Sequence, residues 1–292
     1  MTGDQNGQAS NGNCRFALSV DVEDYFQVWA FSNVIARRAW DGFALRAGDA
    51  TRACLDLFDE HGAKATFFTL GWIAERDRAL VREIVARGHE LASHGYDHTK
   101  VCEQSRDEFF EDVRKTKRLL EDIAGVGVKG YRAAGFSINA ATPWAYEALA
   151  AAGYQYSSSS HPIAHDHYGD ARAPRNPHRS PGGGDLIEAP VATVDMFGKR
   201  ISCAGGGWFR ASPAALSRSL LRRAEASLDG PVIFYFHPWE IDPDQPRIKR
   251  APLKSKIRHY LNLDKMRGKL SKILTAFEWN RIDDALAIGR GS

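Results

Sequence analysis

The chain has 292 residues, of which 43% are hydrophobic and 26% are charged, and its formal net charge is +3. This composition is typical of a folded globular protein and excludes a largely disordered chain. The small net charge excludes nucleic-acid binding by overall basicity, and no apolar run reaches the roughly 18 residues that a membrane-spanning helix needs.

The N-terminal segment 1–14 is polar, and we predict a disordered tail there. It has no basic stretch followed by an apolar one, so it does not resemble a secretory signal, and we expect a cytoplasmic protein. The cysteines form no CxxC pair, which argues against a zinc knuckle and favours reduced thiols. They are Cys14, Cys54, Cys102 and Cys203. We expect residues 15–292 to form a single domain with a basic extension from about residue 245.

Short apolar runs alternate with stretches of helical periodicity along the chain. The expected strands are 15–20, 64–70, 89–92, 128–132 and 231–236, and the expected helices include 49–61, 78–87 and 214–228. A further helix follows Ser105, with Phe109, Val113 and Leu120 on one side, and residues 142–160 predict a helix and a strand that meet at Gly153. Gly62 has the position of a C-terminal cap, and Asp77 and the pair Ser105 and Glu108 have the spacing of N-terminal caps. Residues 161–185 predict a long loop, followed by a pair of strands within 186–205. This order predicts an α/β fold, a parallel sheet or barrel.

Polar residues that could carry chemistry follow the ends of several of these strands. They are Asp21, Glu23 and Asp24 after the first strand, His94 and His98 after the third, Arg132 in the fourth and His237 after the last. Because the carboxyl ends of parallel strands meet at one face, we expect these side chains to form a single site.

Two histidines four residues apart, as in "SHGYDH", can present two nitrogens to one Zn²⁺, with a carboxylate as third ligand and an open position for water. Gly95 follows His94, so the HExxH metalloprotease pattern is excluded. If the first strand stays extended, Asp21 and Glu23 share a face, which favours Asp21 as general base and Glu23 as ligand. Asp24 remains an alternative ligand because the strand ends here.

The segments "SVDVEDYF", "TFFTLGW", "HELASHGYDH", "YRAAGFS" and "FYFHPWEID", in this order, resemble the NodB-type polysaccharide deacetylases, carbohydrate esterase family 4. The segment "AGGGWFR" with "YFHPWEID" is similar to the subgroup associated with exopolysaccharide and exosortase gene clusters. The resemblance implies a distorted (β/α)₇ barrel that removes acetyl groups from N-acetylated sugars with zinc or another divalent metal.

By position, the resemblance implies that Asp21 is the base, His94 and His98 are metal ligands, Arg132 orients the base and His237 is the general acid. An ion pair with Arg132 would keep the Asp21 carboxylate charged and aimed. Two departures stand out: "DVED" replaces a paired "DD", which leaves Glu23 and Asp24 open as the ligand, and "RAAGF" replaces "RxPYG". The backbone donor to an oxyanion would then come from Ala133 or a neighbour.

The stretch "GGGWFR" would let the backbone at Gly206 approach a sugar, with Trp208 available for stacking, although a tight turn fits equally well. Trp208 or Met196 could line an acetyl pocket or pack in the core. Residues 247–272 hold ten Lys and Arg and one acidic residue, Asp264. Such a run is usually a solvated helix face, but it could contact an anionic glycan or a membrane surface; we expect no nucleic-acid partner.

We therefore predict a metal-dependent N-deacetylase acting on an exopolysaccharide or its lipid-linked precursor. Two alternatives are a metal-free amidohydrolase of the same barrel type and a catalytically silent glycan-binding protein.

Overall fold

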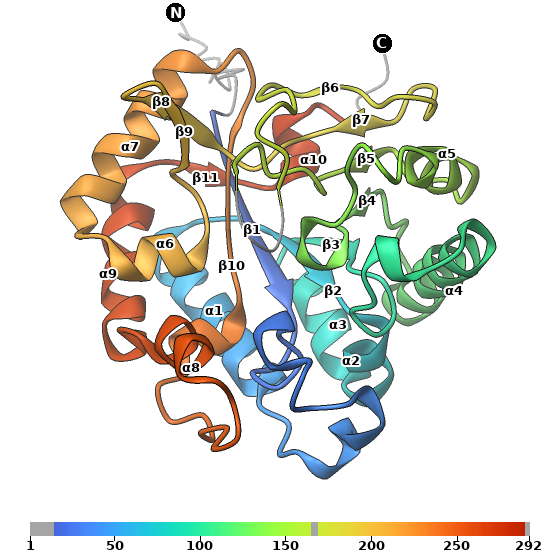
Figure 1. Cartoon of the computed structure of the whole chain (residues 1–292), viewed down its shortest axis with the longest axis horizontal. Coiled ribbons are helices and arrows are strands. Elements are labelled where there is room, and N and C mark those ends of the chain that lie inside the picture. The colour runs from blue at the N-terminus through green and yellow to red at the C-terminus, as the bar shows by residue number, and fades with distance from the viewer. Residues whose placement is uncertain (1–14, 165–168, 290–292) are drawn as a thin grey trace, which may run out of the picture.

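The computed structural model describes residues 15–164 and 169–289, so the predicted disorder of residues 1–14 lies outside the described residues (Figure 1). The strands are β1 (Phe16–Val22), β2 (Thr66–Thr69), β3 (Glu90–Ser93), β4 (Gly130–Tyr131), β5 (Tyr156–Ser157), β6 (His178–Arg179), β7 (Ile187–Glu188), β8 (Thr193–Met196), β9 (Lys199–Ser202), β10 (Val232–Phe236) and β11 (Trp279–Asn280).

The helices are α1 (Ala47–His61), α2 (Gly71–Arg76), α3 (Arg78–Ala86), α4 (Arg106–Ala124), α5 (Trp144–Ala151), α6 (Gly206–Ala211), α7 (Ala214–Ser227), α8 (Leu253–Tyr260), α9 (Leu263–Ala276) and α10 (Ile282–Ala285). Short 3₁₀ turns are η1 (Trp29–Phe31), η2 (Arg37–Gly42), η3 (Val101–Glu103), η4 (Ala134–Phe136) and η5 (Pro238–Ile241). In Figure 1 the longer helices surround the curved sheet, which confirms the predicted α/β fold.

The main sheet runs in the order β10-β1-β2-β3-β4-β5-β7-β6, with β11 also pairing with β1, and β8 and β9 form a separate antiparallel pair. All neighbours in the main sheet are parallel except β6 and β7. The register places Asp21 of β1 opposite Phe68 of β2. The ends of β1, β3, β4 and β10 therefore meet at one end of the sheet, as the strand pattern predicted.

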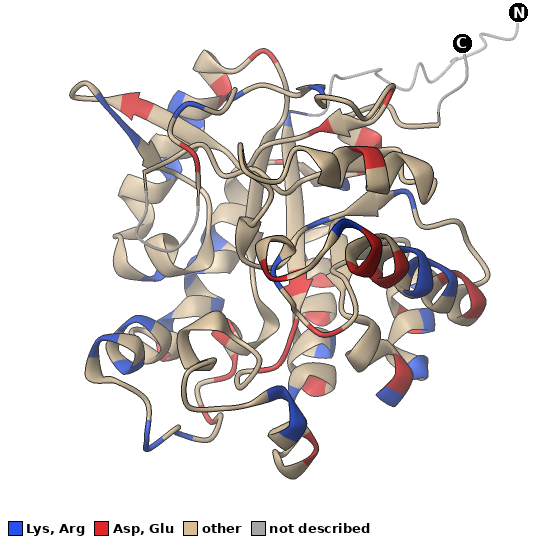
Figure 2. Ribbon diagram, turned by 45° about the vertical axis from the view of Figure 1, so that its right-hand side comes forward, with Lys and Arg blue, Asp and Glu red and all other residues tan. Residues whose placement is uncertain are grey.

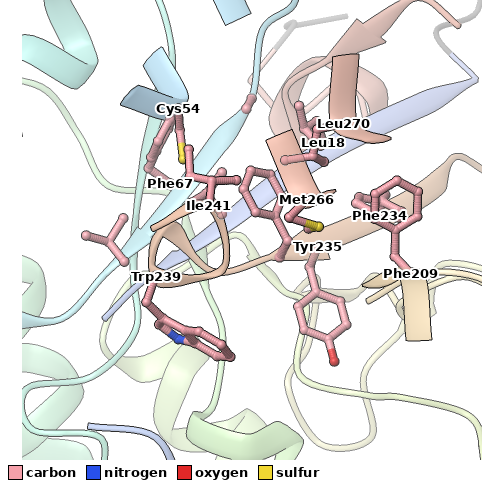
Figure 3. Close-up of a cluster of buried hydrophobic side chains, with 14 of the residues drawn as sticks. Leu18, Cys54, Phe67, Phe209, Phe234, Tyr235, Trp239, Ile241, Met266 and Leu270 are labelled. Atoms are coloured by element: carbon pink, nitrogen blue, oxygen red, sulfur yellow. The ribbon is translucent and has the colours of Figure 1, made fainter. Parts of the chain in front are cut away.

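The core fills the space between the sheet and the outer helices. Leu18 of β1, Phe67 of β2 and Phe234 of β10 belong to one cluster with Cys54 of α1 and Leu270 of α9 (Figure 3). All of these side chains are fully buried. Close packing of side chains from both ends of the sequence fixes β1 and β10 side by side and holds the polar residues at their ends in place.

The local capping signals are confirmed. Gly62 has a left-handed φ of 63° at the end of α1, and the Asp77 carboxylate accepts from the Leu80 N–H at 2.9 Å. Ser105 and Glu108 form the predicted capping box at the start of α4. The segment "GGGWFR", for which a tight turn was one expectation, instead forms the start of the short helix α6.

Candidate active site

Three potential ligands lie together at the ends of β1 and β3. One side-chain ligand atom from each of Glu23, His94 and His98 lies within 4.8 Å of the others. The Nε2 atom of His98 is 3.2 Å from Oε2 of Glu23, and the His94 and His98 rings are 5.2 Å apart. His98 reaches this position because its backbone is left-handed, with φ of 60°, just after Gly95 with φ of 74°.

This cluster fits a divalent metal ion. Oε2 of Glu23 is buried and has no hydrogen-bond partner in the described part of the chain, which is costly unless a cation or donor binds there. Nδ1 of His94 is paired with the Arg132 carbonyl oxygen at 2.8 Å, which directs Nε2 toward the cluster. Burial lowers the pKa of both histidines, that of His98 strongly, so each is neutral and can offer a lone pair. Two nitrogens and one carboxylate oxygen are the donor set of an open zinc site.

Asp24, the alternative ligand, serves a different purpose. One of its carboxylate oxygens accepts from the backbone N–H groups of Arg46 at 2.8 Å and Ala47 at 2.9 Å, and the other accepts from Tyr25 at 2.9 Å. These bonds satisfy the first N–H groups of α1, which need acceptors. The geometry therefore favours Glu23 over Asp24 as the carboxylate ligand, because the Asp24 oxygens accept from the backbone and Asp24 is not part of the cluster.

Asp21 and Arg132 form a buried ion pair beside the cluster. Nη1 of Arg132 donates to Oδ1 of Asp21 at 2.7 Å and to Oγ of Ser19 at 2.9 Å. The remaining guanidinium donors bind Ser158, through its carbonyl oxygen at 3.0 Å and its hydroxyl at 2.8 Å. Arg132 is fully buried, so its planar guanidinium fixes the position of the Asp21 carboxylate.

His237 approaches Glu23 from the end of β10, with its Nε2 atom 3.3 Å from Oε1 of Glu23. Its Nδ1 atom is 2.8 Å from Oε1 of Glu240, whose second oxygen accepts from Nε of Arg210 at 2.6 Å. Burial alone would lower the pKa of His237, but the carboxylates of Glu23 and Glu240 outweigh it and raise the pKa to about 9. Burial raises the pKa of Glu23 to about 7, against the opposing effect of His237. The carboxylates of Glu23 and Glu240 thus favour the protonated form of His237.

Glu240 and Arg210 are residues that the sequence reasoning missed. Burial raises the pKa of Glu240, but Arg210 and His237 more than reverse this and lower it to about 2. The signal for Glu240 was its place three residues after His237 in "HPWE", where a one-turn helix brings the two side chains together. Arg210 is 30 residues away in sequence from Glu240, and nothing local indicates their pairing.

Two of the three predicted substrate-binding residues, Ala133 and Gly206, have different surroundings from those expected. The N–H of Ala133 donates to Oγ of Ser159 at 2.9 Å, so it is occupied rather than available to an oxyanion. A Cβ on Gly206 would lie 1.7 Å from Oε1 of Glu240, so the missing side chain makes room for Glu240 and not for a sugar. Trp208 is exposed on α6, as a stacking residue would be, while Met196 is half-buried at the end of β8.

Residues 41–157 match the family model described as polysaccharide deacetylase. This part of the chain is therefore similar to polysaccharide deacetylases. The span of this match contains His94, His98 and Arg132, while Asp21 and Glu23 precede it. Residues 158–287, including His237, match a second model, described as a domain of unknown function (DUF3473).

Curated relatives of the deacetylase domain align over short segments. The chain is 35% identical over 82 residues to a peptidoglycan-N-acetylglucosamine deacetylase of Bacillus cereus, covering 28% of this chain and 30% of that protein. It is 33% identical over 79 residues to such an enzyme of Listeria monocytogenes, covering 27% of this chain and 17% of that protein. A chitooligosaccharide deacetylase of Azorhizobium caulinodans is 31% identical over 84 residues, which cover 28% of this chain and 40% of that protein. The alignments thus span less than half of each relative's length.

A solved structure has a similar fold over nearly the whole chain. A Mycobacterium smegmatis protein of the polysaccharide deacetylase type superposes with a TM-score of 0.57 at 20% identity, covering 98% of this chain and 92% of that one. This similarity in fold extends over both family matches, so residues 158–287 complete the curved α/β architecture that begins in residues 41–157. In the part of the chain that the structure describes, no helix is long and apolar enough to cross a membrane.

Proposed function

We propose that this chain is a metal-dependent hydrolase that removes N-acetyl groups from amino sugars. The proposal rests on one observation: a carboxylate and a histidine, each fixed by its own partner, lie beside one candidate metal site. Asp21 is fixed by Arg132, and His237 is fixed by Glu240, beside the cluster of Glu23, His94 and His98. Hydrolysis of an amide needs a base for water and an acid for the leaving amine, and the site offers one of each.

Glu23, His94 and His98 would hold the metal ion, Zn²⁺ or another divalent cation. When bound, such an ion supplies Lewis acidity that activates water and polarises the acetyl carbonyl group. Glu23 also interacts with the Trp239 indole N–H at 3.4 Å, which helps to orient its carboxylate. The two histidines are neutral before any ion binds, because burial lowers the pKa of each, so no proton has to leave them first.

Asp21 would accept a proton from the attacking water. Its Oδ1 atom is held by Arg132, and a carboxylate that cannot rotate away keeps its second oxygen available for this task. His237 would then donate its Nε2 proton to the departing nitrogen, because an amine anion is a very poor leaving group. The Nδ1–H group stays bonded to Glu240 throughout, which fixes the tautomer of the neutral ring.

The substrate class rests on the sequence resemblance of residues 204–210 and 235–242 to the exopolysaccharide-associated subgroup. We propose an N-acetylated exopolysaccharide or its lipid-linked precursor as the substrate, and a cytoplasmic location for the reaction. The curated relatives named above act on peptidoglycan N-acetylglucosamine and on chitooligosaccharides, which are also N-acetylated glycans.

The test is release of acetate from a panel of N-acetylated substrates, namely chitooligosaccharides, peptidoglycan fragments and lipid-linked exopolysaccharide repeat units. We expect release from the exopolysaccharide-type substrate, with loss in the His237→Ala variant. Binding of glycans without acetate release from any of them would contradict the proposal and indicate a glycan-binding protein. Full activity in protein shown to be free of metal would indicate a metal-free amidohydrolase.

A further inference from the structure

Helix α8 presents an aliphatic row to solvent. Leu253 is 73% exposed, Ile257 56% and Leu261, directly after the helix, 41%. Residues spaced by four lie on one face of a helix, so these side chains form a continuous strip. We call Leu253, Ile257 and Leu261 the aliphatic strip. Large exposed aliphatic side chains that occur singly need no explanation, but three that line up along a helix and the residue that ends it indicate an interaction surface.

The helix cannot turn this strip inward, because its opposite face is fixed. His259 is buried, its ring stacks on Trp239 at 4.0 Å, and its Nε2 atom is 2.6 Å from Oε1 of Gln245. The Arg210 guanidinium also donates to the carbonyl oxygens of Arg258, His259 and Leu261. A polar histidine is therefore buried while leucine and isoleucine face out, the reverse of the usual arrangement of a surface helix.

Positive charge surrounds the aliphatic strip. Between residues 245 and 263 the sequence contains no Asp or Glu. It contains the basic residues Arg247, Lys249, Arg250, Lys254, Lys256 and Arg258. On the helix, Lys254 and Arg258 lie on one side of the strip and Lys256 on the other. Figure 2 shows these blue segments on α8 and the loop before it, at the lower left.

The strip lies near the end of the sheet that holds the candidate active site. The ring of Phe31 in η1 is 4.7 Å from that of His259, which joins α8 to the segment following β1. Trp29 of the same turn is 41% exposed and lies close to Gly135, three residues after Arg132. In Figure 1, β1 points down toward the segment that follows it, and α8 lies beside that segment.

We propose that α8 docks this chain on an anionic lipid surface. The aliphatic strip would enter the boundary between headgroups and acyl chains, while the lysines and arginines bind lipid phosphates. A second copy of the chain is disfavoured as the occupant, because it would bring two basic surfaces together. A soluble anionic glycan would use the positive charge but would leave the strip in water. The proposal stands apart from the proposed function, since it concerns binding and not the reaction.

The test is co-sedimentation of the full chain with vesicles of phosphatidylcholine alone or of an equal mixture with phosphatidylglycerol. We expect binding to the anionic vesicles only, weakened by salt. The double variant Leu253→Ser with Ile257→Ser should lower the vesicle affinity by about tenfold or more, because it removes two aliphatic side chains that would enter the lipid surface. Lys249→Glu with Arg250→Glu should lower it by a similar factor.

A matched control is Val126→Ser with Leu216→Ser, which removes exposed aliphatic side chains from other elements and should leave binding unchanged. Thermal melting of each variant checks that it is folded. Wild-type protein that binds neither vesicle, or a Leu253 and Ile257 variant that binds as well as wild type, would overturn the proposal. So would self-association that this variant abolishes, or salt-sensitive capture by a soluble anionic polysaccharide with no vesicle binding. Failure to release acetate from any substrate would leave the vesicle result intact and would count only against the proposed function.

Discussion

Asp21 is the residue on which the proposed chemistry depends most, and its contacts separate it from the metal cluster. Its carboxylate is held by Arg132 at 2.7 Å, and Arg132 has further acceptors in Ser19 and Ser158. Asp21→Asn keeps an oxygen for Arg132 but cannot accept a proton. We expect it to retain its metal while acetate release falls by about 10²–10⁴-fold.

The measurement is steady-state acetate release together with metal content of the same preparation. Asp41→Asn is the matched control, because Asp41 pairs with Arg76 at 2.6 Å on the surface and its loss should change neither quantity. A metal-free Asp21→Asn protein would make Asp21 a ligand and would leave the base unassigned.

His237 acts on the leaving group in this account, so the effect of removing it depends on the substrate. His237→Ala should slow cleavage of an N-acetyl amide by about 10²-fold or more, and hydrolysis of an activated aryl acetate far less, because a phenolate leaves without a proton. The two rates are compared in one preparation. An equal loss on both substrates would show that His237 positions the substrate or stabilises charge instead.

In this account Glu240 is a positioning residue that, together with Glu23, raises the pKa of His237. Burial opposes the charge on His237, but Glu23 and Glu240 raise its pKa from 6.5 to about 9. An acid with a raised pKa is active below that value and loses its proton as the pH rises through it. Glu240→Gln removes one of the two carboxylates, so we expect the alkaline fall in the pH–rate profile to move to lower pH. This role would be contradicted if Glu240→Gln lowered the rate equally at every pH and left the alkaline fall at the same pH as in wild type.

At the scale of elements, Asp24 links the end of β1 to the start of α1. Asp24→Ala removes the acceptor for the Arg46 and Ala47 N–H groups in a buried position. We expect the free energy of unfolding to fall by about 1–3 kcal/mol with the metal content unchanged. Asp24→Asn, which keeps one acceptor oxygen, should lose less. Denaturant unfolding measures both, and loss of metal from a folded Asp24→Ala protein would restore Asp24 as a ligand.

The sequence predicted those features of the elements that depend on near neighbours. Strand ends, the Gly62 cap and the Ser105 capping box follow from residues within a few positions, and so did the grouping of His94 with His98. The role of Asp24 could not be predicted, because its partners are 22 and 23 positions away. The need for a glycine at position 206 could not be predicted either, because only the folded chain brings the Glu240 carboxylate against Gly206.

At the scale of the whole molecule, the site depends on both family matches. Residues 41–157 contribute His94, His98 and Arg132, and residues 158–287 contribute His237 with Arg210 and Glu240. Pairing of β1 with β10 brings these groups together, with Ser19 of β1 opposite Tyr235 of β10. The second match therefore supplies part of the candidate active site and not only structural support.

The central claim is that Glu23, His94 and His98 bind the divalent ion on which deacetylation depends. Its most direct test is acetate release from an N-acetylated oligosaccharide after chelation and again after Zn²⁺ is restored, for wild type and for His94→Ala. We predict that wild type loses activity on chelation and regains it with the ion, and that folded His94→Ala regains none. Full activity of the chelated wild type, or full recovery by His94→Ala, would contradict the account.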